Sequence, residues 1–208
     1  MKTVHNDSEF RRMFDQNGVP KEPFEVAEGV WLLDLEEVTS LAGVVLAEDT
    51  LLSGLKNVTS LEGVILTSDV RLSGLSNVTS LEGLVLASNV HLSGLNSVTV
   101  IKDVVFATGV ELHDLPDNFV IDVKPSKAEI DILKRIPLNN LDMYMDHGIS
   151  KCGTTFCIAG WVYYNIEPRA HKDERENVVH HLPTIAPYLF TSTNTMVRFL
   201  TDIQQGDQ

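Results

Sequence analysis

The residues best suited to chemistry lie in one short stretch in the second half of the chain. Both cysteines, Cys152 and Cys157, fall within it, and His147 precedes the first cysteine by five residues. Imidazole and thiolate are zinc ligands, so these three residues, with His180 or His181 as a fourth ligand, define a candidate metal site. Four residues separate the cysteines, which is at the edge of the spacing that structural zinc sites use.

A reactive thiol is a second candidate chemistry for the same stretch. Thr154 is suited to begin a helix over residues 156–164, which would place Cys157 near the helix N-terminus. A helix dipole lowers the pKa of a thiol at that position, and His180 or His181 would then act as the base. Three residues separate Gly153 from Cys157, which does not fit the C-G-[SA]-C-[WY] pattern of papain-like proteases.

A structural role for the two cysteines is the interpretation that we favour. Cys is among the most buried residue types, and Gly160 would allow another element to approach closely. A disulfide between the two cysteines is a further alternative, which a reducing cytoplasm disfavours. We therefore predict no catalytic residue, no metal and no cofactor, with zinc as the alternative, and a structural motif made of Cys152, Gly153, Thr154, Cys157, Gly160 and Trp161.

The run Cys152-Gly153-Thr154-x-x-Cys157-x-Ala159-Gly160-Trp161 resembles a segment of many small, uncharacterised bacteriophage and bacterial proteins. In several of them a Leu-Asp-Met-like stretch precedes it, as residues 141–143 do here, and Val- and Leu-rich repeats lie upstream in some. The resemblance covers residues 140–165. It implies a phage-like origin and brings no activity with it. Many of these proteins have a His before the first or second cysteine, where this chain has Ser150-Lys151 and Phe156.

A twenty-residue repeat precedes this stretch and must organise the first part of the chain. Copies begin at Leu51, Arg71 and His91, with a weaker copy from Leu32 and a fading one from Glu111. The apolar positions of one copy are Leu52, Leu55, Val58, Leu61, Val64, Leu66 and Val70. Gaps of two residues within this set indicate very short strands. Gaps of three residues fit tight corners, which Gly54, Asn57 and Gly63 can form because Gly and Asn tolerate left-handed backbone.

One copy cannot bury these side chains alone, whereas stacked copies can. We therefore predict a mainly β fold with a smaller α unit, in which residues 30–122 form a short β-solenoid of four to five coils. A leucine-rich-repeat-like stack is the alternative, because its period is also near twenty residues. In such a stack Asn57 and Asn77 would form an Asn ladder, and Thr59 and Thr79 an outer polar ladder.

The flanking segments carry helix signals. Residues 1–29 are predicted to be an N-terminal cap with a short helix whose N-cap is Asp7 or Ser8. Residues 123–208 are predicted to be a helical domain, because Ser126 and Glu129 form a capping box before one helix pattern. A pattern over residues 173–181 and another over residues 193–204 indicate further helices. In the last pattern an apolar face is made of Met196, Phe199, Leu200 and Ile203.

The charge of the chain is uneven and restricts its partners. The net charge is −13, and residues 1–122 alone hold 19 acidic and 7 basic side chains. Such acidity argues against direct binding to nucleic acid or to an anionic membrane. The sequence contains no apolar run of membrane-spanning length and no signal peptide, so we expect a cytoplasmic protein in an infected or lysogenic bacterial host.

Phosphate-binding glycine loops and the common hydrolase motifs are missing from the sequence. We therefore expect a non-enzymatic phage-type interaction protein, a monomer or homodimer, that binds and inhibits a host protein. Acidic mimicry and sequestration of a small molecule or nucleotide are possible modes. The acidic residues that we expect to bind are Glu48, Asp49, Glu62, Asp69 and Glu82. A thiol- or metal-dependent enzyme centred on Cys157 and a virion or assembly component are the alternatives.

Overall fold

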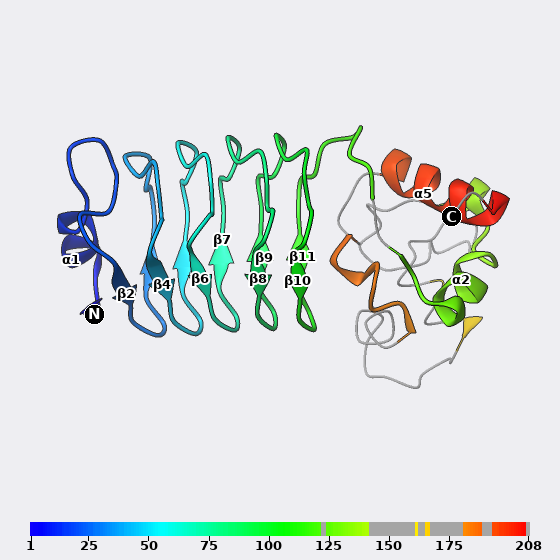
Figure 1. The fold of residues 1–208 in the computed structure, drawn as a ribbon, viewed down its shortest axis with the longest axis horizontal. Coiled ribbons are helices and arrows are strands. Elements are labelled where there is room, and N and C mark those ends of the chain that lie inside the picture. The colour runs from blue at the N-terminus through cyan, green and yellow to red at the C-terminus, as the bar shows by residue number, and fades with distance from the viewer. Residues whose placement is uncertain (122–123, 142–160, 162–164, 167–180, 189–192, 207–208) are drawn as a thin grey trace. The chain divides into compact units, whose positions relative to one another are not determined.

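The computed structural model describes residues 1–121, 124–141, 161, 165–166, 181–188 and 193–206 (Figure 1). The chain divides into two compact units, Met1–Pro116 and Asp117–Gln208. The first unit is a β-solenoid, and the described elements of the second are helical, as the repeat and the helix signals predict. The predicted helices over 156–164 and 173–181 fall almost entirely outside the described residues.

Two parallel sheets run along the solenoid. Sheet 1 has six strands: β1 (Lys2–Val4), β2 (Phe24–Val26), β4 (Val44–Leu46), β6 (Ile65–Leu66), β8 (Val85–Leu86) and β10 (Val105–Phe106). Sheet 2 has five: β3 (Trp31–Leu32), β5 (Leu51–Leu52), β7 (Arg71–Leu72), β9 (His91–Leu92) and β11 (Glu111–Leu112). From β2 onward, paired residues are twenty positions apart, so each coil aligns with the next in the register of the repeat. The structure is a β-solenoid and not a leucine-rich horseshoe.

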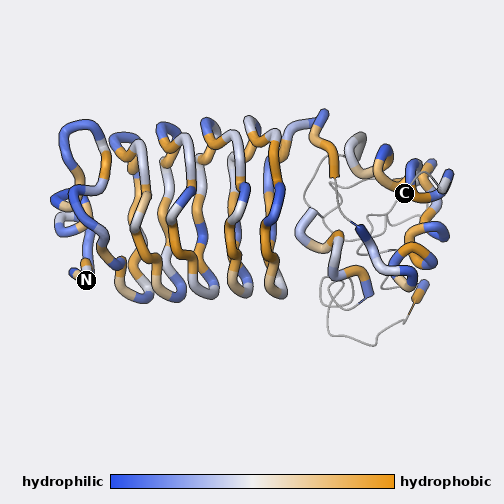
Figure 2. The backbone as a smooth tube through the Cα atoms, in the orientation of Figure 1, coloured by the Kyte–Doolittle hydropathy of each residue, from blue (hydrophilic) through white to orange (hydrophobic). Residues whose placement is uncertain are grey.

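The repeated leucines form the core of this unit. Leu52, Leu72, Leu92 and Leu112 pair with one another in successive strands of sheet 2, and all four are buried. Figure 2 shows the apolar positions recurring from coil to coil. Backbone hydrogen bonds join the coils, as where the N–H of Ser73 donates to the carbonyl of Leu52 at 3.0 Å. The core is therefore continuous along the stack, although no single coil encloses it.

The corners differ in part from the prediction. Gly54 and Gly63 do adopt left-handed backbone, with φ of 80° and 73°. Asn57 does not adopt left-handed backbone, and its side-chain amide forms no ladder with that of Asn77. Each of these amides instead donates to a backbone carbonyl of the preceding coil, Asn57 to Glu36 and Asn77 to Lys56, both at 2.6 Å. The reason is that a corner carbonyl lies outside the strand ladders and needs its own donor.

The N-terminal segment adds a strand that the repeat pattern did not reveal. The short helix α1 (Asp7–Arg12) is present, but its N-cap is Asn6 rather than Asp7 or Ser8, and Asn6 accepts from the N–H of Glu9 at 3.0 Å. Before this helix, β1 pairs with β2 and adds a sixth strand to sheet 1, whereas sheet 2 has five. The repeat pattern did not reveal β1 because this strand lies upstream of the repeat and lacks its sequence.

The second unit contains α2 (Lys127–Leu133), the 3-10 turns η1 (Leu138–Asn140) and η2 (Ala186–Tyr188), and α5 (Thr193–Gln205). The predicted capping box of α2 is present. The predicted apolar face of α5 is buried, and it consists of Met196, Phe199, Leu200 and Ile203. The side-chain amide of Gln204 donates to the carbonyls of Leu133 and Ile136, which fixes α5 against the end of α2.

Candidate functional site

The outer face of sheet 1 carries a row of exposed aliphatic side chains. We call Val45, Ile65, Val85 and Val105 the aliphatic row, because they hold the same position in β4, β6, β8 and β10. Val45 is partly exposed, and the other three are 57%, 66% and 58% exposed. Their neighbours Leu46, Leu66 and Leu86 are buried, as the side-chain period of two requires. At a strand spacing of about 4.8 Å the row extends roughly 14 Å.

Small residues border this row on both sides. Two positions before the row lie Gly43, Gly63, Gly83 and, in the last coil, Asp103. Two positions after it lie Ala47, Thr67, Ala87 and Ala107. None of these residues has a side chain long enough to cover the row. The surface at this sheet is therefore flat, and its centre is apolar.

The five acidic residues singled out in the sequence lie in the turns that flank this surface. Glu62 and Glu82 precede β6 and β8, whereas Glu48, Asp49 and Asp69 follow β4 and β6. All but Asp69 are exposed, and Asp69 accepts a hydrogen bond from the side-chain amide of Asn89 at 3.1 Å. The five residues thus form two acidic columns on either side of the aliphatic row, and not one continuous patch.

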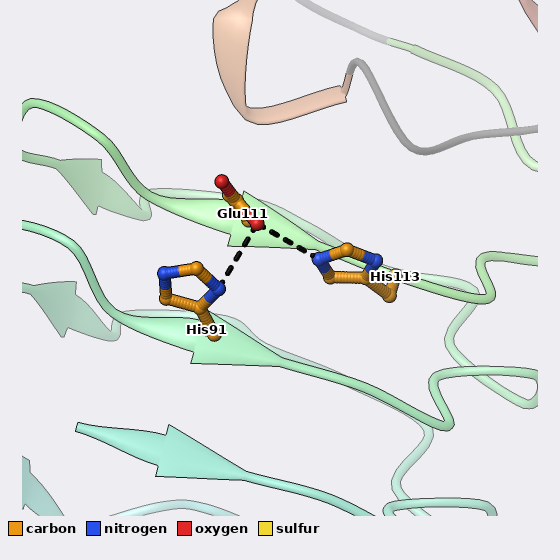
Figure 3. Close-up of side chains that lie close together, drawn as sticks. All are labelled: His91, Glu111 and His113. Carbon is orange, nitrogen blue, oxygen red and sulfur yellow. Dashed lines mark hydrogen bonds and ion pairs between the residues drawn. The ribbon is translucent and has the colours of Figure 1, made fainter. Parts of the chain in front are cut away.

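A second cluster lies on the outer face of sheet 2, in its last two strands (Figure 3). His91 of β9 and Glu111 of β11 are register partners, and His113 follows Glu111 by two residues on the same face. Oε2 of Glu111 lies 2.9 Å from Nδ1 of His91 and 3.0 Å from Nε2 of His113. The two imidazole rings are nearly parallel, with an interplanar angle of 13° and centroids 6.4 Å apart.

The carboxylate of this cluster is buried and the imidazoles are not. Glu111 is 5% exposed, whereas His91 and His113 are each partly exposed. Backbone hydrogen bonds hold all three in place, because their N–H groups donate to Val70, Val90 and Leu92 of the preceding coil. One ligand atom from each side chain lies within 4.8 Å of the others, so together they offer two nitrogens and one oxygen to an ion.

Neither His91 nor His113 was a candidate in the sequence, where His91 served only to mark the start of a repeat copy. The signal was present: His91 and Glu111 occupy the same position of consecutive repeats, and His113 follows two residues later. In a solenoid with twenty-residue coils those spacings place all three side chains on one face.

The cysteine-containing stretch lies largely outside the described residues. This applies to His147, Cys152, Gly153, Thr154, Cys157, Gly160 and His180, so the metal and thiol interpretations stay predictions. Trp161 is described and buried, and its carbonyl accepts from the side-chain amide of Asn165 at 2.9 Å. The guanidinium of Arg135 lies 5.8 Å from the centroid of the Trp161 ring, a distance typical of a cation–π contact.

Comparisons with family models, with curated proteins and with solved structures give no match for this chain. In the part of the chain that the structure describes, helices are too short or too polar to cross a membrane.

Proposed function

We propose that this chain is a non-enzymatic interaction protein that binds another protein through the outer face of sheet 1. The aliphatic row carries this proposal. Contiguous exposed aliphatic side chains are unfavourable in water, and such patches mark interaction sites on soluble proteins. A flat surface of short strands, glycine and alanine suits a macromolecular partner better than a small molecule, which needs a concave pocket.

The acidic columns define the chemistry of the partner. Glu62 and Glu82 on one side and Asp49 and Asp69 on the other place negative charge beside Val45, Ile65 and Val85, whereas Lys102 holds the equivalent position before Val105. A second copy of this chain would bring equal charges together, which costs energy at an interface. The complementary partner has an apolar strip flanked by Lys and Arg. Many nucleic-acid-binding proteins carry basic surfaces of this kind, which is in keeping with acidic mimicry.

The biological setting of this proposal is inhibition of a bacterial host protein by a phage-type protein. Its support is the resemblance of residues 140–165 to segments of bacteriophage proteins, together with the strong acidity of residues 1–122. A basic host protein would be attracted to the solenoid before contact and held by the aliphatic row after it.

The proposal is tested by comparing two variants with equal chemical change. Ile65 and Leu33 are both exposed aliphatic residues, at 57% and 58%, but Leu33 follows β3 and lies outside sheet 1. Proteins are recovered from a nuclease-treated bacterial lysate with the wild type, Ile65→Glu and Leu33→Glu. We expect one basic protein that the wild type and Leu33→Glu retain, that Ile65→Glu loses, and that elutes as salt rises.

Two results would overturn the proposal. One is recovery of the basic protein in equal amounts with Ile65→Glu and Leu33→Glu, which would show that sheet 1 does not bind it. The other is a concentration-dependent dimer of the wild type that Ile65→Glu dissociates, which would assign the row to self-association. Because both positions are exposed, each substitution should change the free energy of unfolding by no more than about 0.5 kcal/mol, which circular dichroism can verify.

A further inference from the structure

We propose that His91, Glu111 and His113 bind a divalent transition metal of the zinc class on the outer face of sheet 2. The site lies on sheet 2, whereas the proposed protein-binding surface lies on sheet 1, and its ligands are not the residues of the cysteine stretch that the sequence analysis named. Its three ligands are two imidazole nitrogens and one carboxylate oxygen.

The donor set favours zinc over magnesium or calcium. Imidazole is a ligand for zinc, copper, nickel and iron, whereas magnesium and calcium prefer oxygen ligands alone. Two His and one Glu are also a ligand set known from zinc sites in which a fourth position holds water.

The distances are compatible with an ion after a small adjustment. In a tetrahedral zinc site with bonds of about 2.1 Å, ligand atoms lie about 3.4 Å apart. The oxygen of Glu111 is now 2.9 and 3.0 Å from the two imidazole nitrogens. An opening of roughly 0.5 Å is therefore needed for zinc bonds of normal length. Partly exposed imidazoles can supply it by rotating, while the buried carboxylate stays in place.

The fold provides the preorganisation that a metal site requires. His91 and Glu111 are fixed as register partners of β9 and β11, and His113 is two residues beyond Glu111. All three are therefore positioned by the coil register and not by a long loop, which keeps the entropy cost of assembling the site low. Burial of Glu111 adds to the effect, because a buried carboxylate gains more from a cation than an exposed one.

The experiment uses the tag-free full-length chain, freed of metal with a chelator and titrated with Co²⁺ followed by Zn²⁺. We expect one equivalent of Co²⁺ to bind with visible d–d absorption and without a thiolate charge-transfer band, and Zn²⁺ to displace it. Loss of one ligand, in His91→Ala or His113→Ala, should weaken binding by at least about 100-fold. The matched control His5→Ala removes an exposed histidine outside the site and should leave binding unchanged.

Two outcomes would overturn the assignment. The first is that micromolar Co²⁺ and Zn²⁺ fail to bind the wild type. The second is binding with a thiolate band that Cys152→Ser/Cys157→Ser abolishes and His91→Ala leaves intact. The band itself is read on the wild type, and circular dichroism establishes that the serine variant is folded. The conservative variant His91→Gln and circular dichroism spectra show whether weaker binding by His91→Ala comes from loss of the ligand or from a change in the fold.

Discussion

The Nδ1 atom of His91 lies 2.9 Å from Oε2 of Glu111, although twenty residues separate them in the chain. The register of the coils makes them neighbours. Inward positions of sheet 2 repeat the same residue, Leu, from β3 to β11. Outward positions of the same strands change along the stack, and they read Trp31, Leu51, Arg71, His91 and Glu111. The solenoid thus keeps one core while the outer face of sheet 2 varies.

The core leucines should be the main source of stability in the first unit. Leu75 is fully buried, so Leu75→Ala should lower the free energy of unfolding by about 2–5 kcal/mol. Leu33→Ala removes the same atoms from an exposed site and should cost less than about 1 kcal/mol. Urea unfolding followed by circular dichroism measures both. Equal losses would mean that the inner columns are not the core.

The corner glycines differ in how much space surrounds them. Gly74 and Gly83 both have positive φ, but a Cβ on Gly74 would lie 3.0 Å from the backbone nitrogen of Leu55, whereas one on Gly83 would meet nothing within 4 Å. Gly83→Ala should cost about 1–2 kcal/mol, from backbone strain alone. Gly74→Ala should cost roughly 1–3 kcal/mol more, because it also overpacks the corner. Thermal unfolding of the two variants gives the comparison, and a larger loss for Gly83→Ala would contradict it.

The amide of Asn77 should stabilise the stack through the bond to Lys56. In the next coil the equivalent residue is Ser97, whose hydroxyl donates to the carbonyl of Ser76 at 2.6 Å. Asn77→Ser therefore keeps a hydroxyl that can donate to the carbonyl of Lys56, as Ser97 does in the next coil, whereas Asn77→Ala removes the donor. We expect Asn77→Ala to lower the free energy of unfolding by about 0.5–1.5 kcal/mol and Asn77→Ser to lower it less. Urea titration checks the order, and the reverse order would refute the role of this bond.

Glu129 should make the second unit sensitive to acid. Burial raises the pKa of Glu129, but hydrogen bonds from Ser126 and Thr184 outweigh burial and hold the pKa below its usual value. A carboxylate with a lowered folded pKa stabilises the fold above its unfolded pKa, and this contribution disappears as pH falls through the folded pKa. Glu129→Gln should therefore destabilise the unit at pH 7 by roughly 1.5–3 kcal/mol.

The difference between Glu129→Gln and the wild type should shrink as the pH falls below the unfolded pKa, which lies near 4.5. Both proteins are best compared in a Trp31→Phe background, so that Trp161 is the remaining tryptophan and its fluorescence reports the second unit. Glu28→Gln, on the exposed surface of the first unit, is the control and should show little change at any pH. A constant difference from neutral to acidic pH would contradict the assignment.

The sequence predicted the solenoid because its inward positions recur exactly where a stack needs them. Val64, Leu66, Val70 and Leu72 were expected to point inward from two short strands, and all four are buried. The strand β1 escaped prediction because it precedes the repeat. The N-cap was misplaced by one or two residues because Asn6, Asp7 and Ser8 all have capping side chains.

The outward features were harder to predict for a physical reason. Hydrophobic periodicity reports what is buried, and it treats Ile65 and Val85 as part of an apolar strand without saying that they face water. The acidic residues were recognised one by one, but their division into columns follows from the turns before and after each strand of sheet 1. The cluster around Glu111 follows from aligning the copies that begin at His91 and Glu111, and the pairing of β9 and β11 confirms that alignment.

Photocrosslinking tests the proposed binding surface most directly. A benzophenone amino acid is placed at Val85, in the centre of the aliphatic row, or at the equally accessible Leu33 as the control, and the chain is irradiated in living bacteria. We predict a crosslink from position 85 to a protein with a basic surface, and none to that protein from position 33. The same crosslinked protein from both positions, or none from position 85 when position 33 gives one, would contradict the claim that sheet 1 is the binding surface.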